Sequence, residues 1–230
     1  MEDNTQNAAP AASGKPADEN RNIVVTVGRQ FGSGGRELGR KLADRMGVKY
    51  YDKELLSEAA KRAGVSEEFF EKSDERFPKF LNGIFSFAFG MNPFNAYTGS
   101  TSISGDSLYQ AQSDFIHQLA RESSCVIVGR TSDYVLRDHP RRVNVFVHAP
   151  EEACIDRITR RETDETTREQ ARQQLRRTNQ LRANYYNFYT DKTWGDAASY
   201  DLTFDTSLLP MDDIVELIVS YINRRFGEKF

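Results

Sequence analysis

Cysteine, histidine and long apolar runs are scarce in this sequence, and each scarcity argues against a class of protein. The two cysteines, Cys125 and Cys154, lie in apolar or helical contexts without a pairing motif, so a disulfide or zinc framework is not expected. The three histidines are scattered, which favours neither a metal site nor a histidine-based catalytic triad. No run of about 18 apolar residues occurs. We therefore expect a soluble, cytoplasmic protein with no membrane partner.

An excess of charge of one sign is also missing. The 31 Lys and Arg residues against 34 Asp and Glu residues give a net charge of −3, so no nucleic-acid partner is expected. Material for a core is plentiful, because the chain has 15 Phe, 10 Tyr and 38% hydrophobic residues. With 230 residues, the chain is long enough for one globular domain with small insertions.

The pattern of apolar residues divides the chain into a tail and a folded part. Residues 1–21 are polar and lack apolar periodicity, which predicts a disordered tail. Beyond them, short β-branched runs alternate with segments of helical periodicity. Strands are predicted at 22–27, 48–51, 124–128, 142–148 and 200–204, and helices at 36–46, 53–63, from Pro150 onward and at 211–226. This alternation predicts an α/β fold with three layers and a parallel, five-stranded sheet.

Two segments interrupt the alternation and look like appendages of the sheet. Residues from about 69 to 123 are predicted to be a helical insert with a Phe-rich stretch at 80–97. That stretch fits ordinary packing of the insert, a surface that pairs with another subunit, or a flap over a substrate. Residues 157–194 are predicted to be a long, Arg-rich helical segment.

The most informative segment is the glycine-rich turn at residues 28–37, between the first strand and the first helix. Glycines let the backbone curl round an anion, and the helix N-terminus adds positive potential, so the turn predicts a phosphate site. A turn without a ligand is the alternative, and a dinucleotide fingerprint fits less well. The residues expected to bind ATP phosphates are Gly32, Ser33, Gly34, Gly35, Arg36 and Glu37.

The match of this turn to the P-loop pattern G-x-x-x-x-G-K-[ST] is imperfect. If Gly34 is the second glycine, Gly35 takes the lysine position; if Gly28 is the first glycine, Arg36 falls there only in a loop longer than the pattern. We expect Arg36 to reach the transferring phosphates through its bidentate guanidinium. The hydroxyl that holds magnesium is absent as well, so Ser33 or Glu37 must substitute if a metal is held here.

At this point the chain resembles the nucleoside monophosphate kinases, and most closely the cytidylate kinase-like branch of the P-loop kinases. The resemblance covers residues from about 22 to 226. The segments that carry it are Phe31-Gly-Ser-Gly-Gly-Arg-Glu-Leu38, Tyr50-Tyr-Asp-Lys-Glu-Leu55, Cys125-Val-Ile-Val-Gly-Arg130 with Ser132-Asp-Tyr134, and Arg182-Ala-Asn-Tyr-Tyr-Asn-Phe-Tyr-Thr190 followed by Trp194-Gly-Asp196 and Tyr200-Asp-Leu202. Together these segments are more specific than any one of them.

The resemblance implies a kinase domain over 22–228 that moves the γ-phosphoryl group of ATP to CMP or dCMP with Mg²⁺. It implies nucleotide substrates and a monomer or homodimer. The implied parts are a core at 22–68, 124–156 and 197–228, an acceptor-binding insert at about 69–123 and a lid at about 157–196.

The Arg-rich segment supplies charge suited to phosphoryl transfer. Between residues 157 and 182 eight arginines face four acidic residues. A basic flap that closes on a polyphosphate would exclude water and neutralise charge. We expect Arg161 and Arg182 to act in catalysis, with Arg157 and Arg177 as further candidates. The alternative is a solvated helix with ion pairs along its surface.

The acceptor site is expected at the carboxyl ends of the second and third strands, where open α/β sheets bind ligands. Gly129-Arg130 resembles the Gly-Arg pair of cytidylate kinases, whose arginine contacts the acceptor nucleotide; Thr131 follows where an acid is usual, so Asp133 is the nearest acid. Asp52 resembles the aspartate of the family's Tyr-x-Asp-Thr-Gly segment, although it could equally be a helix N-cap.

Two other functions stay open at this stage. The first is a kinase of a non-nucleotide small molecule on the same fold, since the residues after Asp52 and Arg130 depart from the family pattern. The second is a nucleotide-binding regulatory protein without catalysis, which the missing P-loop lysine and hydroxyl favour.

Overall fold

The structure is a computed structural model that describes residues 21–52, 105–161 and 166–230, apart from the side chains of 105–108 and 161. Several predicted features lie outside the described residues: the tail up to residue 20, the helix at 53–63, and the insert up to residue 104 with its Phe-rich stretch at 80–97. In the part that is described, strands and helices alternate as the apolar pattern predicts.

A parallel sheet forms the centre of the fold, in the strand order β2-β3-β1-β4-β5. Its strands are β1 (Val24–Arg29), β2 (Lys49–Tyr51), β3 (Cys125–Val128), β4 (Arg142–His148) and β5 (Leu202–Asp205). The central strand β1 is in register with both neighbours, because Val24 pairs with Cys125 on one side and with Arg142 on the other. The prediction of a five-stranded parallel sheet is confirmed.

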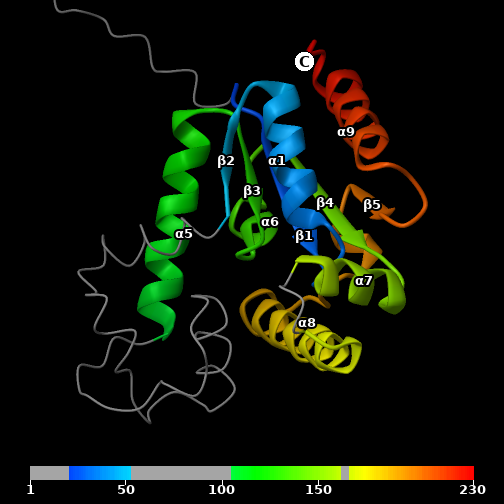
Figure 1. Ribbon diagram of the computed structural model, residues 1–230. Helices are drawn as coiled ribbons and strands as arrows, with labels where there is room; N and C mark the ends of the chain where they lie inside the picture. Colours follow the sequence, from blue (N-terminus) through cyan, green and yellow to red (C-terminus); the bar gives the residue numbers. More distant parts are fainter. Residues whose placement is uncertain (1–20, 53–104, 162–165) are drawn as a thin grey trace, which may run out of the picture.

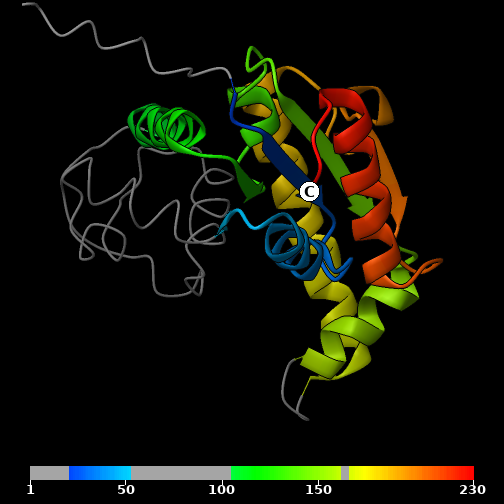
Figure 2. The same ribbon diagram turned by 90° about the horizontal axis from the view of Figure 1, so that it is seen from above.

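Helices cover both faces of the sheet, which confirms the predicted three layers (Figures 1 and 2). One face carries α1 (Gly35–Met46) and α9 (Met211–Phe226), and the other carries α5 (Gly105–Glu122) and α6 (Ser132–Val135). Because helices pack on both sides, β1 and β3 are apolar and buried along most of their length. The second half of α5, which falls in the range expected for the insert, packs on the sheet through Phe115, Ile116 and Leu119.

The Arg-rich segment forms two helices at the carboxyl edge of the sheet, α7 (Glu151–Arg161) and α8 (Arg168–Thr190) (Figure 1). They pack on each other through a small apolar cluster that includes Ile155, Ile158 and Leu175. A capping box between Thr167 and Gln170 begins α8. This pair of helices lies beside the turn between β1 and α1, because Asn179 of α8 accepts a hydrogen bond from the backbone of Phe31 in that turn.

Candidate functional site

The glycine-rich turn lies where β1 ends and α1 begins. Gly34 is the N-cap of α1 in the left-handed conformation, with φ of 86°, which glycine adopts at little cost. As a glycine, Gly34 offers no side chain to cap this helix end. The first N–H groups of a helix have no partner within the helix, and together with the helix dipole they favour an anion. The geometry of the turn therefore suits phosphate oxygens.

Three interactions hold the turn in place from outside. The Asn179 Oδ1 in α8 accepts a hydrogen bond from the backbone N–H of Phe31 at 2.7 Å. The Thr206 hydroxyl, in the loop after β5, donates to the carbonyl oxygen of Ser33 at 2.7 Å. The guanidinium of Arg157 donates in turn to the Thr206 hydroxyl and carbonyl oxygens, at 2.8 and 2.6 Å. The shape of the turn therefore depends on α7, α8 and the loop after β5.

Asp52, directly after β2, collects several hydrogen bonds in the same region. It is 3% exposed, and its Oδ2 accepts a hydrogen bond of 2.6 Å from the Nε of Arg36. Its Oδ1 lies 3.5 Å from the Nη2 of Arg29 at the end of β1, and the Tyr50 hydroxyl lies 3.5 Å from Oδ2. Asp52 thus joins the second strand to the glycine-rich turn, as expected from its place at the carboxyl end of that strand.

Two further arginines lie close to this carboxylate. Burial, with the charge of Arg29 adding to its effect, lowers the pKa of Arg130, which follows β3, to about 10. Burial also lowers the pKa of Arg182 well below its usual value, with Arg29 and Arg130 adding to the effect. The Arg182 Nη1 donates to the carbonyl oxygen of Arg29 at 2.9 Å, and its guanidinium lies 5.6 Å from the centre of the Phe31 ring.

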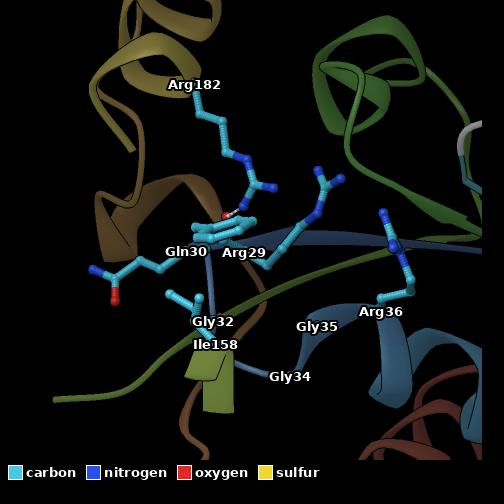
Figure 3. A pocket seen from close by; sticks show the side chains of 9 residues that line it. Arg29, Gln30, Gly32, Gly34, Gly35, Arg36, Ile158 and Arg182 are labelled. Carbon is cyan, nitrogen blue, oxygen red and sulfur yellow. Dashed lines mark hydrogen bonds between the residues drawn. The ribbon is translucent and has the colours of Figure 1, made fainter. Parts of the chain in front are cut away.

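We call Arg29, Arg36, Arg130 and Arg182, with Asp52, the arginine cluster. In it four cationic side chains lie around the carboxylate of Asp52, and guanidinium groups gathered in this way favour the binding of an anion such as phosphate. Figure 3 shows Arg29, Arg36 and Arg182 reaching from three elements toward the space beside the turn. The pocket there is lined by Arg29, Gln30, Phe31, Gly32, Gly34, Gly35, Arg36, Ile158 and Arg182.

The backbone after β3 is strained. Gly129, Arg130 and Thr131 all have positive φ, at 77°, 65° and 52°. A residue other than glycine in this region costs of order 1–3 kcal/mol and persists only where its surroundings fix it. The buried side chain of Gln112 in α5 donates to the Arg130 carbonyl oxygen at 3.2 Å, and so helps to fix this conformation.

The structure brings most of the residues expected from the sequence together, but it places others elsewhere. Asp133, in α6, accepts a hydrogen bond of 2.7 Å from the Tyr186 hydroxyl in α8. Ser33 is buried, and its hydroxyl donates to the Gln30 carbonyl oxygen at 2.9 Å. Glu37 is exposed on α1 beside Lys41. The Arg161 side chain lies outside the description.

Other arginines of the Arg-rich segment form ion pairs at the surface, as one of the two interpretations predicts. Arg172 reaches Glu151, Glu152 and Glu169 at 3.2, 2.9 and 2.8 Å. Arg168 pairs with Glu152 at 2.5 Å, and Arg176 pairs with Glu151 at 2.9 Å. Most of these pairs join α8 to α7 rather than neighbours on one helix.

Sequence reasoning missed Arg29, Asn179 and Thr206. Arg29 carried a weak signal, because it is a charged residue at the end of a buried strand. Asn179 and Thr206 carried none, since each acts through one hydrogen bond to a distant backbone group.

The described residues offer neither a metal-binding cluster nor a helix suited to span a membrane. These residues contain no group of three or more His, Cys, Asp or Glu side chains placed to hold a metal ion. Their helices include none with the length and apolar character needed to cross a bilayer.

Comparison with known proteins identifies relatives that match most of the chain. A profile of the cytidylate kinase-like family matches residues 24–208. A cytidylate kinase of Pyrococcus furiosus is 26% identical over 202 residues, which make up 87% of this chain and 88% of that protein. An uncharacterized protein from Eubacterium ventriosum has a similar structure, with a TM-score of 0.64 and 24% identity over 87% of this chain and 98% of its own. A gluconokinase from Sinorhizobium meliloti gives a TM-score of 0.49 and 15% identity, over 89% and 94% of the two chains.

Proposed function

The chain belongs to the cytidylate kinase-like family, and from this we propose that it transfers the γ-phosphoryl group of ATP to CMP or dCMP. An oxygen of the acceptor's phosphate forms a bond to the γ-phosphorus while the bond to the leaving ADP oxygen breaks. The arginine cluster beside the glycine-rich turn carries the proposal. Phosphoryl transfer depends on alignment and on positive charge around the transferring group, and this cluster supplies both at one place.

On the donor side, the turn and α8 bind ATP. The N–H groups of the turn, from Gly32 to Gly35, and the uncapped start of α1 hold the phosphate oxygens. Arg182 extends from α8 into the same pocket and stabilises negative charge on the γ-phosphoryl group. Arg36 and Arg161 are proposed to assist, Arg36 from its place on Asp52.

On the acceptor side, the ends of β2 and β3 bind the monophosphate. Arg130 binds the acceptor phosphate, because its guanidinium follows the end of β3, near Asp52 and the other arginines of the cluster, and suits bidentate hydrogen bonding to a phosphate. Asp52 orients Arg36 and Arg29. Asp133 accepts from Tyr186 of α8, so we propose that it acts on the acceptor site by fixing α8.

Magnesium is proposed to enter with ATP, as part of the MgATP substrate. The ion neutralises charge on the phosphates when it is bound. The described residues contain no cluster of three or more metal-ligating side chains, and the Ser33 hydroxyl already donates within the turn. That Ser33 and Glu37 contact the ion stays a prediction.

The test is an assay of ADP release with ATP and magnesium, scanned over CMP, dCMP, UMP, AMP, GMP and dTMP. We expect turnover with CMP and dCMP, and an increased KM for CMP in Arg130→Ala. Arg224→Ala is the matched control, because Arg224 is exposed near the end of α9, at the opposite edge of the fold (Figure 1).

Two outcomes would contradict the proposal. Turnover with a small alcohol or acid but with no nucleotide would favour a kinase of a non-nucleotide substrate. Measurable ATP binding without turnover on any acceptor would favour a regulatory nucleotide-binding protein.

A further inference from the structure

The structure decides which glycine of the turn corresponds to the second glycine of the P-loop pattern. Gly34 is the left-handed residue at the start of α1, and Gly35 is the first residue of the helix. The pattern then assigns the lysine position to Gly35 and the first glycine position to Arg29, five residues before Gly34. Glycine and cation have therefore exchanged places between these two positions.

The packing of Arg29 and Gly35 explains why the two changes occur together. A Cβ atom at Gly35 would lie 2.5 Å from the Cβ and 2.8 Å from the Cγ of Arg29, closer than van der Waals contact allows. The Arg29 side chain thus covers the Cα from which a P-loop lysine would extend. At its other end, a Cβ at Gly129 would overlap the Arg29 Nη1. Two glycines therefore leave the space that Arg29 occupies.

The charged end of Arg29 lies inside the arginine cluster, where it faces Asp52, Arg36, Arg130 and Arg182. Its side chain is 16% exposed, and its Nη2 lies 3.5 Å from Asp52, which the Nε of Arg36 approaches to 2.6 Å. Burial lowers the pKa of Arg29, the charge of Asp52 raises it in part, and the charge of Arg36 lowers it. Arg29 thus shares Asp52 with Arg36 and also lines the pocket beside the turn, where its guanidinium can bind an anion.

We propose that Arg29 replaces the missing P-loop lysine and binds the terminal phosphates of the nucleoside triphosphate. The identity of that ligand rests on the proposed function; the anion site itself rests on the packing of Arg29. Arginine contributes a planar, bidentate guanidinium where lysine contributes a point charge. Arg36, whose Nε is bound to Asp52, then acts on the phosphates from the side of β2.

An exchange of residues tests this assignment. The single variants are Arg29→Met, Arg29→Gly and Gly35→Lys, and the double variant is Arg29→Gly/Gly35→Lys. Arg29→Met keeps an unbranched side chain over Gly35, and Arg224→Ala is the control. Binding of ATP and of inorganic tripolyphosphate is measured by calorimetry, and thermal unfolding shows whether each variant keeps its fold.

We expect Arg29→Met and Arg29→Gly to bind tripolyphosphate about 100-fold more weakly, since each removes a largely buried charged group. The double variant recovers most of that loss, because the lysine regains its position once Arg29 no longer covers it. Gly35→Lys alone unfolds at a lower temperature, because the two side chains overlap.

The inference is overturned if folded Arg29→Met binds ATP and tripolyphosphate as tightly as the wild type. It is also overturned if the double variant folds and binds no more tightly than Arg29→Gly. The assay of CMP turnover separates this result from the proposed function. Tripolyphosphate binding that depends on Arg29, without turnover of CMP, would support the role of Arg29 and contradict CMP as the acceptor. Turnover of CMP that is unchanged in Arg29→Met would support CMP as the acceptor and contradict the role of Arg29.

Discussion

The side chain of Asn179 in α8 holds the backbone N–H of Phe31 in the glycine-rich turn at 2.7 Å, although 148 residues separate them in the sequence. The same helix carries Arg182, which lines the pocket beside that turn. A change in the position of α8 would therefore move the turn and Arg182 together. Because the backbone of the turn is proposed to bind phosphate, Asn179 couples the helix to the donor site.

We predict that Asn179→Ala increases the KM for ATP and lowers the free energy of unfolding by about 1–2 kcal/mol, because a partly buried N–H loses its acceptor. Gln180→Ala is the control, since the adjacent exposed side chain bonds only to Asn184 among the contacts described. Its effect should stay within about 0.5 kcal/mol. Urea denaturation and steady-state kinetics measure both, and equal effects of the two changes would contradict the coupling.

Asp52→Asn should destabilise the protein by about 3 kcal/mol, because the arginine cluster loses its carboxylate. Added tripolyphosphate should then raise the Tm of the variant more than that of the wild type, since the ligand replaces the lost charge. Asp212→Asn is the matched control, because its ion pair with Lys41 at 2.7 Å is exposed to solvent and contributes little to stability. If tripolyphosphate raises the Tm of Asp52→Asn and the Tm of the wild type equally, Asp52 does not balance the charge of this site.

Local patterns predicted the scaffold and the turn, because a buried β-branched strand, glycines and helical periodicity are all visible within a few residues. The partners of individual side chains were not predictable in this way. Asp133 fitted an acceptor contact by its place after Arg130, but Tyr186, 53 residues away, binds its carboxylate. The space for Arg29 depends on Gly35 and Gly129, which belong to different elements. Such relations arise only once the sheet has brought the strand ends together.

The arginines of the Arg-rich segment should differ sharply in their effect on catalysis. We predict that Arg182→Ala lowers kcat/KM by about 100-fold, because a largely buried cation beside the phosphates is lost. Arg172→Ala should stay within about threefold, since its partners are exposed carboxylates on α7 and α8. Initial rates at varied ATP and CMP give both ratios. A similar loss in the two variants would show that the charge of the whole segment matters, rather than the position of Arg182.

Asp133 should make the stability of the protein depend on pH. Burial raises the pKa of its carboxyl above the usual value, while the hydrogen bond from Tyr186 lowers it in part. The folded state therefore binds a proton more readily than the unfolded state, and the contribution of this group to stability is lost as the pH rises through the folded pKa. Above the folded pKa the carboxylate is ionised against a desolvation cost, which Asp133→Asn removes while keeping an oxygen that accepts from Tyr186.

We predict that the free energy of unfolding of the wild type, minus that of Asp133→Asn, increases as the pH falls from 7 toward 4. The difference removes the contribution of the other carboxylates to the pH dependence, because they become protonated and lose their ion pairs in both proteins. Urea denaturation at four or five pH values measures this difference. Asp138→Asn serves as the control, because Asp138 is exposed and its substitution removes no desolvation cost. A difference that stays constant or decreases over this range would mean that Asp133 is stabilised as the anion, with Tyr186 outweighing burial.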